Sequence, residues 1–243
     1  MKQSKLIENN KLSLNKRSII KSFSRSAKTY DIWAIPQNKV AKHLIHLTDK
    51  NTLKGKILDA GCGTGLLTKN LFEIDSHLDI IGIDASQNMI DIYKQINQNV
   101  MIDDMESLSF NDNCVDHVFS SFSLHWTNIE KSLFELIRVT SKYLSIALPI
   151  KGSLQEFQFP FPDKEYIYSI LRKNGIQITK LDTSHVKIPF SGMKLIEYFH
   201  YTGSSFNGSK RVGLIKRNSL ENYIHQYNNR ELYYNILYMT GQK

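Results

Sequence analysis

The stretch Ile57-Leu58-Asp59-Ala60-Gly61-Cys62-Gly63-Thr64-Gly65 decides the fold class, because a short apolar run leads directly into a glycine-rich turn. Residues 66–72 follow with apolar residues at helical spacing. Glycine allows the backbone to turn sharply and to approach a ligand without a clash from a Cβ atom. This succession of strand, turn and helix predicts the first unit of an α/β sheet, with a ligand bound at the turn.

Strand and helix patterns alternate on the C-terminal side of this turn. The expected strands cover residues 57–60, 80–84, 100–102, 115–121 and 143–149. Ser86 is expected to cap one of the intervening helices, and Thr127-Asn128-Ile129-Glu130 fits a capping box before another. Alternation at this spacing predicts a Rossmann-like α/β fold with a doubly wound, mostly parallel seven-stranded sheet.

The segments on either side of this alternation are expected to cover it. Residues 1–15 predict a flexible tail, and residues 16–150 an N-terminal helical cap followed by the ligand-binding core. Residues 151–243 are expected to form a lid insertion after the fifth strand and to complete the sheet, with helices at 163–173, 192–201 and 218–227 and an edge strand at 231–239. One apolar stripe predicts a single amphipathic helix through Ile19, Phe23, Ala27, Tyr30 and Ala34, with a break at or after Pro36.

Length and composition limit the class of protein. The 243 residues, with 41% hydrophobic and 22% charged residues, suffice for one α/β domain with an added lid. The two cysteines predict no disulfide framework and a reducing cytoplasm, and the polar N-terminal segment predicts no secretory signal. No apolar run approaches the ~18 residues of a membrane span. The net charge of +8 is dispersed, which favours a solvated basic surface or an acidic protein partner over nucleic acid.

The chemistry of the glycine turn favours one ligand, S-adenosylmethionine. The spacing is G-x-G-x-G, whereas a dinucleotide site has G-x-G-x-x-G. Asp59 precedes the turn, and a carboxylate there would repel a diphosphate but attract the ammonium and sulfonium groups of S-adenosylmethionine. We therefore expect Asp59, Gly61, Gly63 and Gly65 to bind this cofactor.

Further cofactor-binding residues are expected at the carboxyl ends of the next strands, where open α/β sheets bind ligands. Asp84, with Ala85, is placed to accept hydrogen bonds from the ribose hydroxyls. Asp104 is placed to accept one from the adenine amino group, with Met105 packed on the ring, and Ser120 lies at the end of the fourth strand. Taken singly, Asp84 could instead be an acidic residue that precedes a helix, and Asp103 or Asp104 could be acidic residues of a loop with no part in binding.

Four segments indicate which family of methyltransferases the chain resembles. They are Phe23-Ser24-Arg25-Ser26-Ala27-Lys28-Thr29-Tyr30-Asp31, Asp104-Met105-Glu106-Ser107-Leu108, Ser120-Ser121-Phe122-Ser123-Leu124-His125-Trp126 and Gly152-Ser153-Leu154-Gln155-Glu156-Phe157. In these segments the chain resembles the malonyl-[acyl-carrier protein] O-methyltransferases of biotin synthesis. The resemblance implies transfer of a methyl group to the free carboxylate of a malonyl thioester, carried by acyl carrier protein or coenzyme A, as the first step of pimeloyl formation.

Such a reaction needs little acid–base chemistry, since a malonyl carboxylate is already ionised at pH 7. The sequence has no Ser-His-Asp set, no Cys-x-x-Cys and no spaced histidine cluster, which argues against a hydrolase or a metal enzyme. Tyr30 and His125 are the candidate catalytic residues, although Tyr30 could be a core aromatic and His125 a packing residue. His200, Tyr201 and Arg211 are candidates for binding the substrate carboxylate, with a surface role as the alternative for Arg211.

The chain departs from the pattern of this family at three places. In the segment 120–126, Ser121 and His125 stand where Asn and Gln are more usual. Thr140-Ser141-Lys142 replaces the usual Pro-Gly turn, and His200 stands where a lysine is more common. One alternative is therefore a methyltransferase for another small carboxylic acid or a quinone precursor. Another is a non-catalytic assembly factor of the same fold, in which the cofactor residues would be expected to decay.

Overall fold

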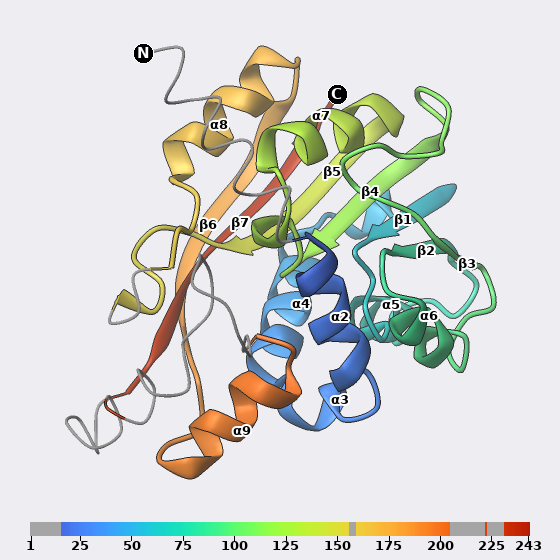
Figure 1. The fold of residues 1–243 in the computed structure, drawn as a ribbon. Coiled ribbons are helices and arrows are strands. Elements are labelled where there is room, and N and C mark those ends of the chain that lie inside the picture. Colours follow the sequence, from blue (N-terminus) through green and yellow to red (C-terminus); the bar gives the residue numbers. More distant parts are fainter. Residues whose placement is uncertain (1–15, 156–158, 205–221, 223–230) are drawn as a thin grey trace.

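The computed structural model describes residues 16–155, 159–204, 222 and 231–243 (Figure 1). The expected tail at 1–15, and the expected helix at 218–227 apart from residue 222, lie outside these ranges. Within them the helices are α2 Lys16–Ser26, α3 Tyr30–Trp33, α4 Ile35–Leu47, α5 Leu66–Phe72, α6 Gln87–Tyr93, α7 Ile129–Val139, α8 Lys164–Lys173 and α9 Met193–Tyr201. Short 3₁₀ turns, η1 and η2, cover Lys50–Thr52 and Leu124–Trp126.

Seven strands form one sheet. They are β1 Lys56–Ala60, β2 Asp79–Asp84, β3 Val100–Ile102, β4 Val115–Ser121, β5 Thr140–Pro149, β6 Gln177–Lys187 and β7 Tyr233–Gln242. The order is β3-β2-β1-β4-β5-β7-β6; β7 runs antiparallel to both of its neighbours, and the other pairs are parallel. The predicted mostly parallel, Rossmann-like sheet is confirmed.

The place of the last strand was predicted wrongly. β7 is not an edge strand; it lies between β5 and β6, and β6 forms the edge. The burial of the two strands gives the physical reason. Residues 234–241 of β7 are nearly all buried, whereas most of β6 is exposed or half-buried. A strand whose side chains are covered on both faces belongs inside a sheet.

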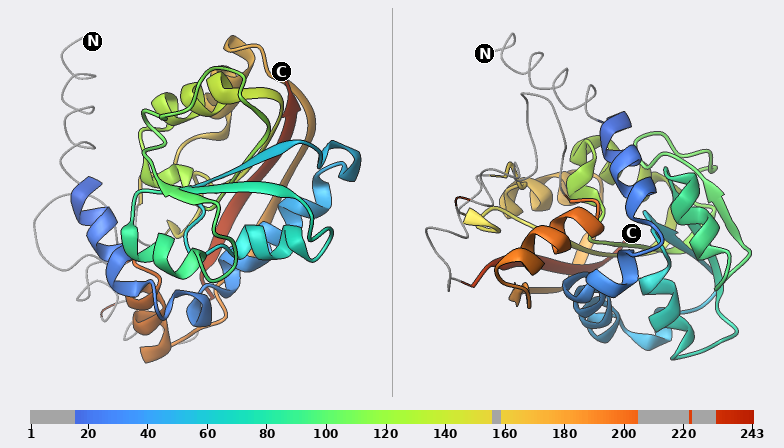
Figure 2. Two further views of the ribbon diagram at one scale, coloured as in Figure 1. Left: turned by 90° about the vertical axis from the view of Figure 1, so that its right-hand side faces the viewer. Right: turned by 60° about the horizontal axis from the view of Figure 1, so that its bottom comes forward.

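Helices cover both faces of the sheet, as a doubly wound fold requires (Figure 1). Side chains alternate along a strand, so that Ile57 packs with α4, α5 and α9 on one face, while Leu58 packs with α7 and α8 on the other. α2 (dark blue in Figure 2) lies beside α6 and α9. The N-terminal helix thereby comes to lie over the carboxyl ends of the first strands.

The N-terminal stripe does not form the single helix that we predicted. α2 ends at Ser26, and the Ser26 carbonyl accepts hydrogen bonds from Thr29 N (2.9 Å) and Thr29 Oγ1 (3.2 Å), which close a turn. Pro36 then lies in the first turn of α4, where its missing N–H is tolerated. The stripe is therefore divided between α2 and α3, and each helix can take its own direction over the sheet.

One of the two predicted caps is also shifted. Ser86 caps α6 as expected, accepting a hydrogen bond from Met89 N at 3.4 Å. The cap of α7 is Asn128 rather than Thr127, and its side chain accepts from Lys131 N at 3.2 Å. Thr127 Oγ1 instead donates to the Leu124 carbonyl.

Candidate active site

A cavity with an empty volume of about 1010 Å³, open solvent at its mouth included, lies at the carboxyl ends of β1, β2 and β4. Its walls come from α2, the glycine turn after β1, the end of β2, the loop after β3 and the segment after β4. The ends of parallel strands meet at one edge of a sheet, so residues far apart in sequence converge there.

The three glycines of the turn have different surroundings. Gly61 and Gly63 line the cavity, and a Cβ atom on Gly63 would meet nothing within 4 Å. Gly65 is not among the lining residues; it begins α5, and a Cβ atom there would lie 2.6 Å from Ile96 Cδ1. All three have positive φ, at 73°, 54° and 91°. Gly61 and Gly63 therefore provide backbone next to a ligand, while Gly65 allows close packing of the helix.

Asp59 forms part of the cavity wall beneath the turn. Its carboxylate accepts a hydrogen bond from Thr68 Oγ1 at 2.7 Å, and Thr68 Oγ1 also contacts Tyr93 Oη at 2.9 Å. Burial raises the pKa of Asp59 to about 7, because the charged form is poorly solvated there. Within the described chain no lysine or arginine pairs with Asp59, so a cationic ligand group would supply the missing countercharge.

Asp84 joins the glycine turn to the end of β2. Its Oδ2 accepts from Gly63 N at 3.0 Å and its Oδ1 from Ser86 N at 2.8 Å. Each carboxylate oxygen keeps a further lone pair that can accept a ligand hydroxyl. Burial is the main reason that the pKa of Asp84 is raised, to about 6. Ala85 lines the cavity beside it. The Asp84 carboxylate could therefore accept hydrogen bonds from ribose hydroxyls, as predicted for this position.

The acids after β3 divide into one that holds the loop and one that faces α2. Asp103 accepts from Asp104 N (2.8 Å), Ser109 N (3.0 Å) and Ser109 Oγ (3.2 Å). Both carboxylate oxygens of Asp104 lie 2.5 Å from Lys16 Nζ. Met105 lines the cavity as well. Asp104 and Met105 thus both line the cavity, and their adenine-binding role stays a prediction. An adenine amino group there would share Asp104 with Lys16, a residue that the sequence did not single out.

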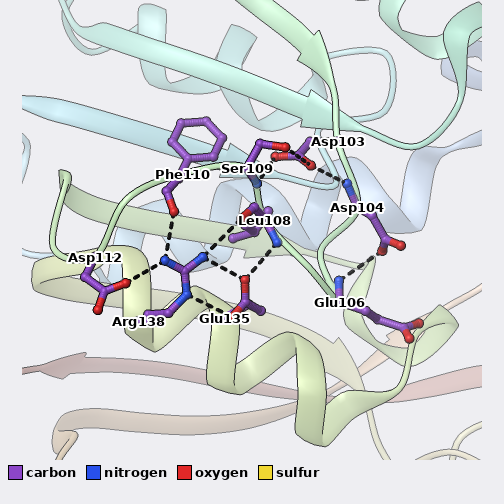
Figure 3. A network of polar contacts seen from close by, with 9 residues as sticks. All are labelled: Asp103, Asp104, Glu106, Leu108, Ser109, Phe110, Asp112, Glu135 and Arg138. Carbon is purple, nitrogen blue, oxygen red and sulfur yellow. Dashed lines mark hydrogen bonds and ion pairs between the residues drawn. The ribbon is translucent and has the colours of Figure 1, made fainter.

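The far side of this loop is fixed by Arg138, in the last turn of α7 (Figure 3). Its guanidinium donates to both Glu135 oxygens (2.9 and 2.7 Å) and to Asp112 Oδ1 (2.7 Å). It also donates to the carbonyls of Phe110 (2.8 Å) and Leu108 (3.1 Å). The pKa of Glu135 is lowered mainly by its hydrogen bond from Arg138. The loop that carries Asp104 and Met105 is thus tied to α7 by backbone and side-chain bonds together.

The end of β4 presents Ser121 to the cavity rather than the predicted Ser120. Ser120 is fully buried behind the wall, where its Oγ donates to the Ala60 carbonyl at 3.0 Å and lies 2.7 Å from Ser123 Oγ. Ser121, Phe122 and Ser123 all line the cavity.

Tyr30 and Gln37 line the inner part of the cavity, one from α3 and the other from α4. Burial, followed by the nearby Tyr198, raises the pKa of Tyr30 well above its usual range, so its hydroxyl remains a hydrogen-bond donor. Gln37 is 4% exposed and its Nε2 donates to Tyr198 Oη at 3.2 Å. In the sequence, Gln37 follows the segment 23–31 and belongs with it to the family resemblance, but its spacing alone indicates no role for it.

His125 does not line this cavity. Its ring packs among Trp126 (centroids 4.7 Å apart), Phe122 (5.3 Å) and Phe161 (5.7 Å). Burial lowers the pKa of His125 to about 3, so the ring is neutral near pH 7. The surroundings correspond to the packing role that we considered as the alternative.

The predicted carboxylate-binding residues are not brought to the cavity. His200 is exposed on α9, and Tyr201 stacks on Trp33 with ring centroids 5.4 Å apart. Neither residue lines the cavity. Arg211 lies outside the described residues.

Two kinds of feature are absent from the described residues. These residues contain no group of three or more side chains that could together hold a metal ion. No described helix has both the length and the apolar character needed to cross a membrane.

A seven-stranded sheet of this order, with Asp59 below the glycine turn and Asp84 at the end of β2, is the arrangement expected of a class I methyltransferase. The chain has the fold of this class and contains a methyltransferase domain, and its cofactor is S-adenosylmethionine. Residues 58–143 match the family model described as a methyltransferase domain.

Within this class the chain resembles malonyl-[acyl-carrier protein] O-methyltransferases. It is 27% identical over 222 residues to the one from Buchnera aphidicola, a match that covers 85% of this chain and 89% of that protein. It is 30% identical over 149 residues to the one from Serratia marcescens, covering 59% of this chain and 57% of that protein. Other curated relatives of the same name are likewise matched over about half of their length.

Solved structures agree with the fold. A methyltransferase from Thermotoga maritima, described as S-adenosylmethionine-dependent and a possible histamine N-methyltransferase, superposes with a TM-score of 0.58 at 16% identity. The superposition covers 91% of this chain and 98% of that one.

Proposed function

We propose that the chain transfers the methyl group of S-adenosylmethionine to the free carboxylate of a malonyl thioester, carried by acyl carrier protein or coenzyme A. The product is the methyl ester, and the step would begin pimeloyl formation in biotin synthesis. The observation that carries this proposal is the match with the Buchnera protein, which extends over 89% of that protein and is not confined to the methyltransferase domain.

The cavity provides what such a transfer needs from the protein. Asp59, Asp84 and the backbone at Gly61 and Gly63 are the residues that would hold S-adenosylmethionine, with Asp104 and Met105 at its adenine end. When bound, S-adenosylmethionine supplies an electrophilic methyl group on a positively charged sulfur. Holding the two reactants in line and excluding water accounts for most of the acceleration in a reaction of this kind.

The charges near the cavity agree with a reaction that needs no base. The malonyl carboxylate is ionised at neutral pH before it binds. Tyr30 keeps its proton, because burial raises its pKa. His125, the other predicted catalytic residue, is neutral and lies behind the cavity wall. We therefore assign Tyr30 a hydrogen-bonding role in orienting the acceptor and no proton transfer.

The net charge of +8 supports an acidic protein as the carrier of the acyl group. Charges of opposite sign accelerate association, and salt screens the effect. The association rate with acyl carrier protein should accordingly fall as salt is added. An association rate that does not depend on salt would argue against a basic docking face.

The direct test uses the purified chain with S-adenosylmethionine labelled in the methyl group. Malonyl-acyl carrier protein, malonyl-coenzyme A and a succinyl thioester are offered separately. We expect a base-labile methyl ester on one or both malonyl thioesters and little on the longer succinyl acceptor. If the chain binds S-adenosylhomocysteine in a calorimeter but methylates no malonyl thioester, the proposed substrate is wrong.

A further inference from the structure

The inner part of the cavity contains two buried polar atoms that have no hydrogen-bond partner in the described structure, Gln37 Oε1 and Ser121 Oγ. Both residues line the cavity. A buried polar group without a partner is unfavourable, and in a native protein it calls for an explanation such as a functional role or a bound water or ion. A ligand that fills the cavity would complete both atoms. These two atoms come from α4 and β4, on different walls of the same space.

Gln37 also belongs to a short buried network that has more donors than it uses. Gln37 Nε2 lies 3.2 Å from Tyr198 Oη, and Tyr198 Oη lies 3.2 Å from Tyr234 Oη. The amide has two N–H bonds and the tyrosines have two hydroxyls, which gives about four donors. The two hydrogen bonds within the network use two of these donors. As placed, the amide leaves the acceptor Oε1 without a partner; turned by 180°, Oε1 accepts from Tyr198 Oη and both amide N–H bonds are free to donate to a ligand. Two donors of the network are in surplus in either orientation. Ser121 adds another hydroxyl donor to the same cavity.

A site with surplus neutral donors suits a ligand group that only accepts hydrogen bonds. An ionised carboxylate is such a group. The lysine that lines the cavity, Lys16, lies at the opposite end, where it pairs with Asp104. Among the described lining residues the inner part therefore has hydrogen-bond donors but no cation.

We propose that Gln37 and Ser121 bind the carboxylate of the methyl acceptor, an inference that rests on the proposed function. They hold one carboxylate oxygen through neutral hydrogen bonds and leave the other free. The free oxygen forms the new C–O bond while the C–S bond to the methyl group breaks and its electron pair stays on sulfur; no proton moves. A paired arginine or lysine would hold the negative charge more tightly and lower the reactivity of the attacking oxygen.

The experiment compares Gln37→Leu, Gln37→Glu and Ser121→Ala with the wild type and with Gln98→Glu. Gln98 is exposed at the end of the segment after α6, so the same chemical change there controls for added charge. Binding of malonyl-coenzyme A is measured by calorimetry in the presence of S-adenosylhomocysteine. Acetoacetyl-coenzyme A, in which a methyl ketone replaces the carboxylate, is the matched ligand. Binding of S-adenosylhomocysteine alone reports whether each variant is folded.

We expect the dissociation constant for malonyl-coenzyme A to rise by about ten-fold or more in both Gln37 variants, and by a smaller factor in Ser121→Ala. The preference for malonyl- over acetoacetyl-coenzyme A should shrink in parallel. Binding of S-adenosylhomocysteine should stay within about two-fold of the wild type, as should every property of Gln98→Glu.

The experiment distinguishes failure of the proposed carboxylate site from failure of the proposed function. If the wild type methylates a malonyl thioester and the Gln37 and Ser121 variants keep its affinity and KM for the acceptor, the inference is overturned and the proposed function stands. If malonyl-coenzyme A binds in a Gln37-dependent way but is not methylated, the carboxylate site stands and the proposed function falls. A wild type that neither binds nor methylates malonyl thioesters overturns both.

Discussion

Replacing Arg138 with alanine tests whether the network of Figure 3 holds the adenine end of the site. The substitution removes the guanidinium from Glu135 and from the carbonyls of Leu108 and Phe110. The Arg138 side chain is 22% exposed and that of Glu135 14% exposed, whereas Asp112 is 70% exposed. The Asp112 pair is therefore solvated and contributes little, and most of the effect comes from the other three partners.

The expected loss of stability follows from these partners. Leaving a partly buried group without its hydrogen bond costs about 1–3 kcal/mol, and neighbouring losses are not additive. We expect the free energy of unfolding of Arg138→Ala to fall by roughly 2–4 kcal/mol in urea titrations. Arg138→Lys should fall between this variant and the wild type, because an ammonium group cannot reproduce the planar fork of donors.

The same variant should bind S-adenosylhomocysteine several-fold more weakly, since the released loop carries Asp104 and Met105. Lys142→Ala is the matched control. Lys142 is 60% exposed and pairs with Asp116 on the surface, where water screens the pair, so its loss should change the free energy of unfolding much less. Equal stability of Arg138→Ala and Lys142→Ala would refute the structural role of the network. A clear loss of stability with unchanged cofactor affinity would show that the loop is not coupled to the site.

Three further predictions concern the cofactor turn and its surroundings. Burial raises the pKa of Asp59 to about 7 and that of Asp84 to about 6, so affinity for the cationic cofactor should fall as pH drops from about 8 to about 5, and less steeply in Asp84→Asn. The stability of the ligand-free protein should depend on pH with the opposite sign: the contribution of these two groups is present at pH 4 and is lost as pH rises through 6 to 7. Calorimetry measures the affinity and urea titrations measure the stability, each at several pH values. Gly63→Ala should lower the unfolding midpoint less than Gly65→Ala but weaken S-adenosylhomocysteine binding more, because a Cβ on Gly63 points into open space and one on Gly65 meets packed side chains. If unfolding and calorimetry show the larger loss of stability in Gly63→Ala and the larger loss of affinity in Gly65→Ala, these roles of the two glycines are wrong. His125→Gln should leave the shape of the pH–rate profile unchanged between about pH 5 and 9, because the pKa of His125 is already about 3; loss of an inflection near pH 6.5 would show that this ring titrates during the reaction.

The parts of the fold that depend on local pattern could be predicted from the sequence. The apolar run at Ile57–Ala60, the helix at Leu66–Phe72 and the cap at Ser86 depend only on neighbouring residues, and the structure has all three. The place of β7 could not be predicted in this way, because it depends on pairing with strands whose nearest residues lie more than 45 positions away in the chain.

The site shows the same division between local and distant information. Asp59 and Asp84 end strands that any α/β pattern would reveal, and both line the cavity. Ser120 and Ser121 alternate in direction along β4, and a register irregularity between Val115 and His117 shifts the strand against its neighbour, so the pattern alone does not decide which serine faces the cavity. Lys16 and Gln37 line the cavity from α2 and α4, on either side of the turn after Ser26, and this depends on how the N-terminal helices pack over the sheet.

The distribution of charge in the cavity suits the proposed methyl transfer. The donor end has one buried carboxylate, Asp59, and one half-buried carboxylate, Asp84, while the inner end has neutral hydrogen-bond donors. A cationic methyl donor and an anionic acceptor become two neutral products, so charge disappears as the transition state forms. Water stabilises the separated charges more than the transition state, and a dry cavity removes that preference. The apolar side chains of Ile19, Ile20 and Phe23 on α2 line the cavity, and they therefore contribute to the rate by excluding water, with no side chain needed to move a proton.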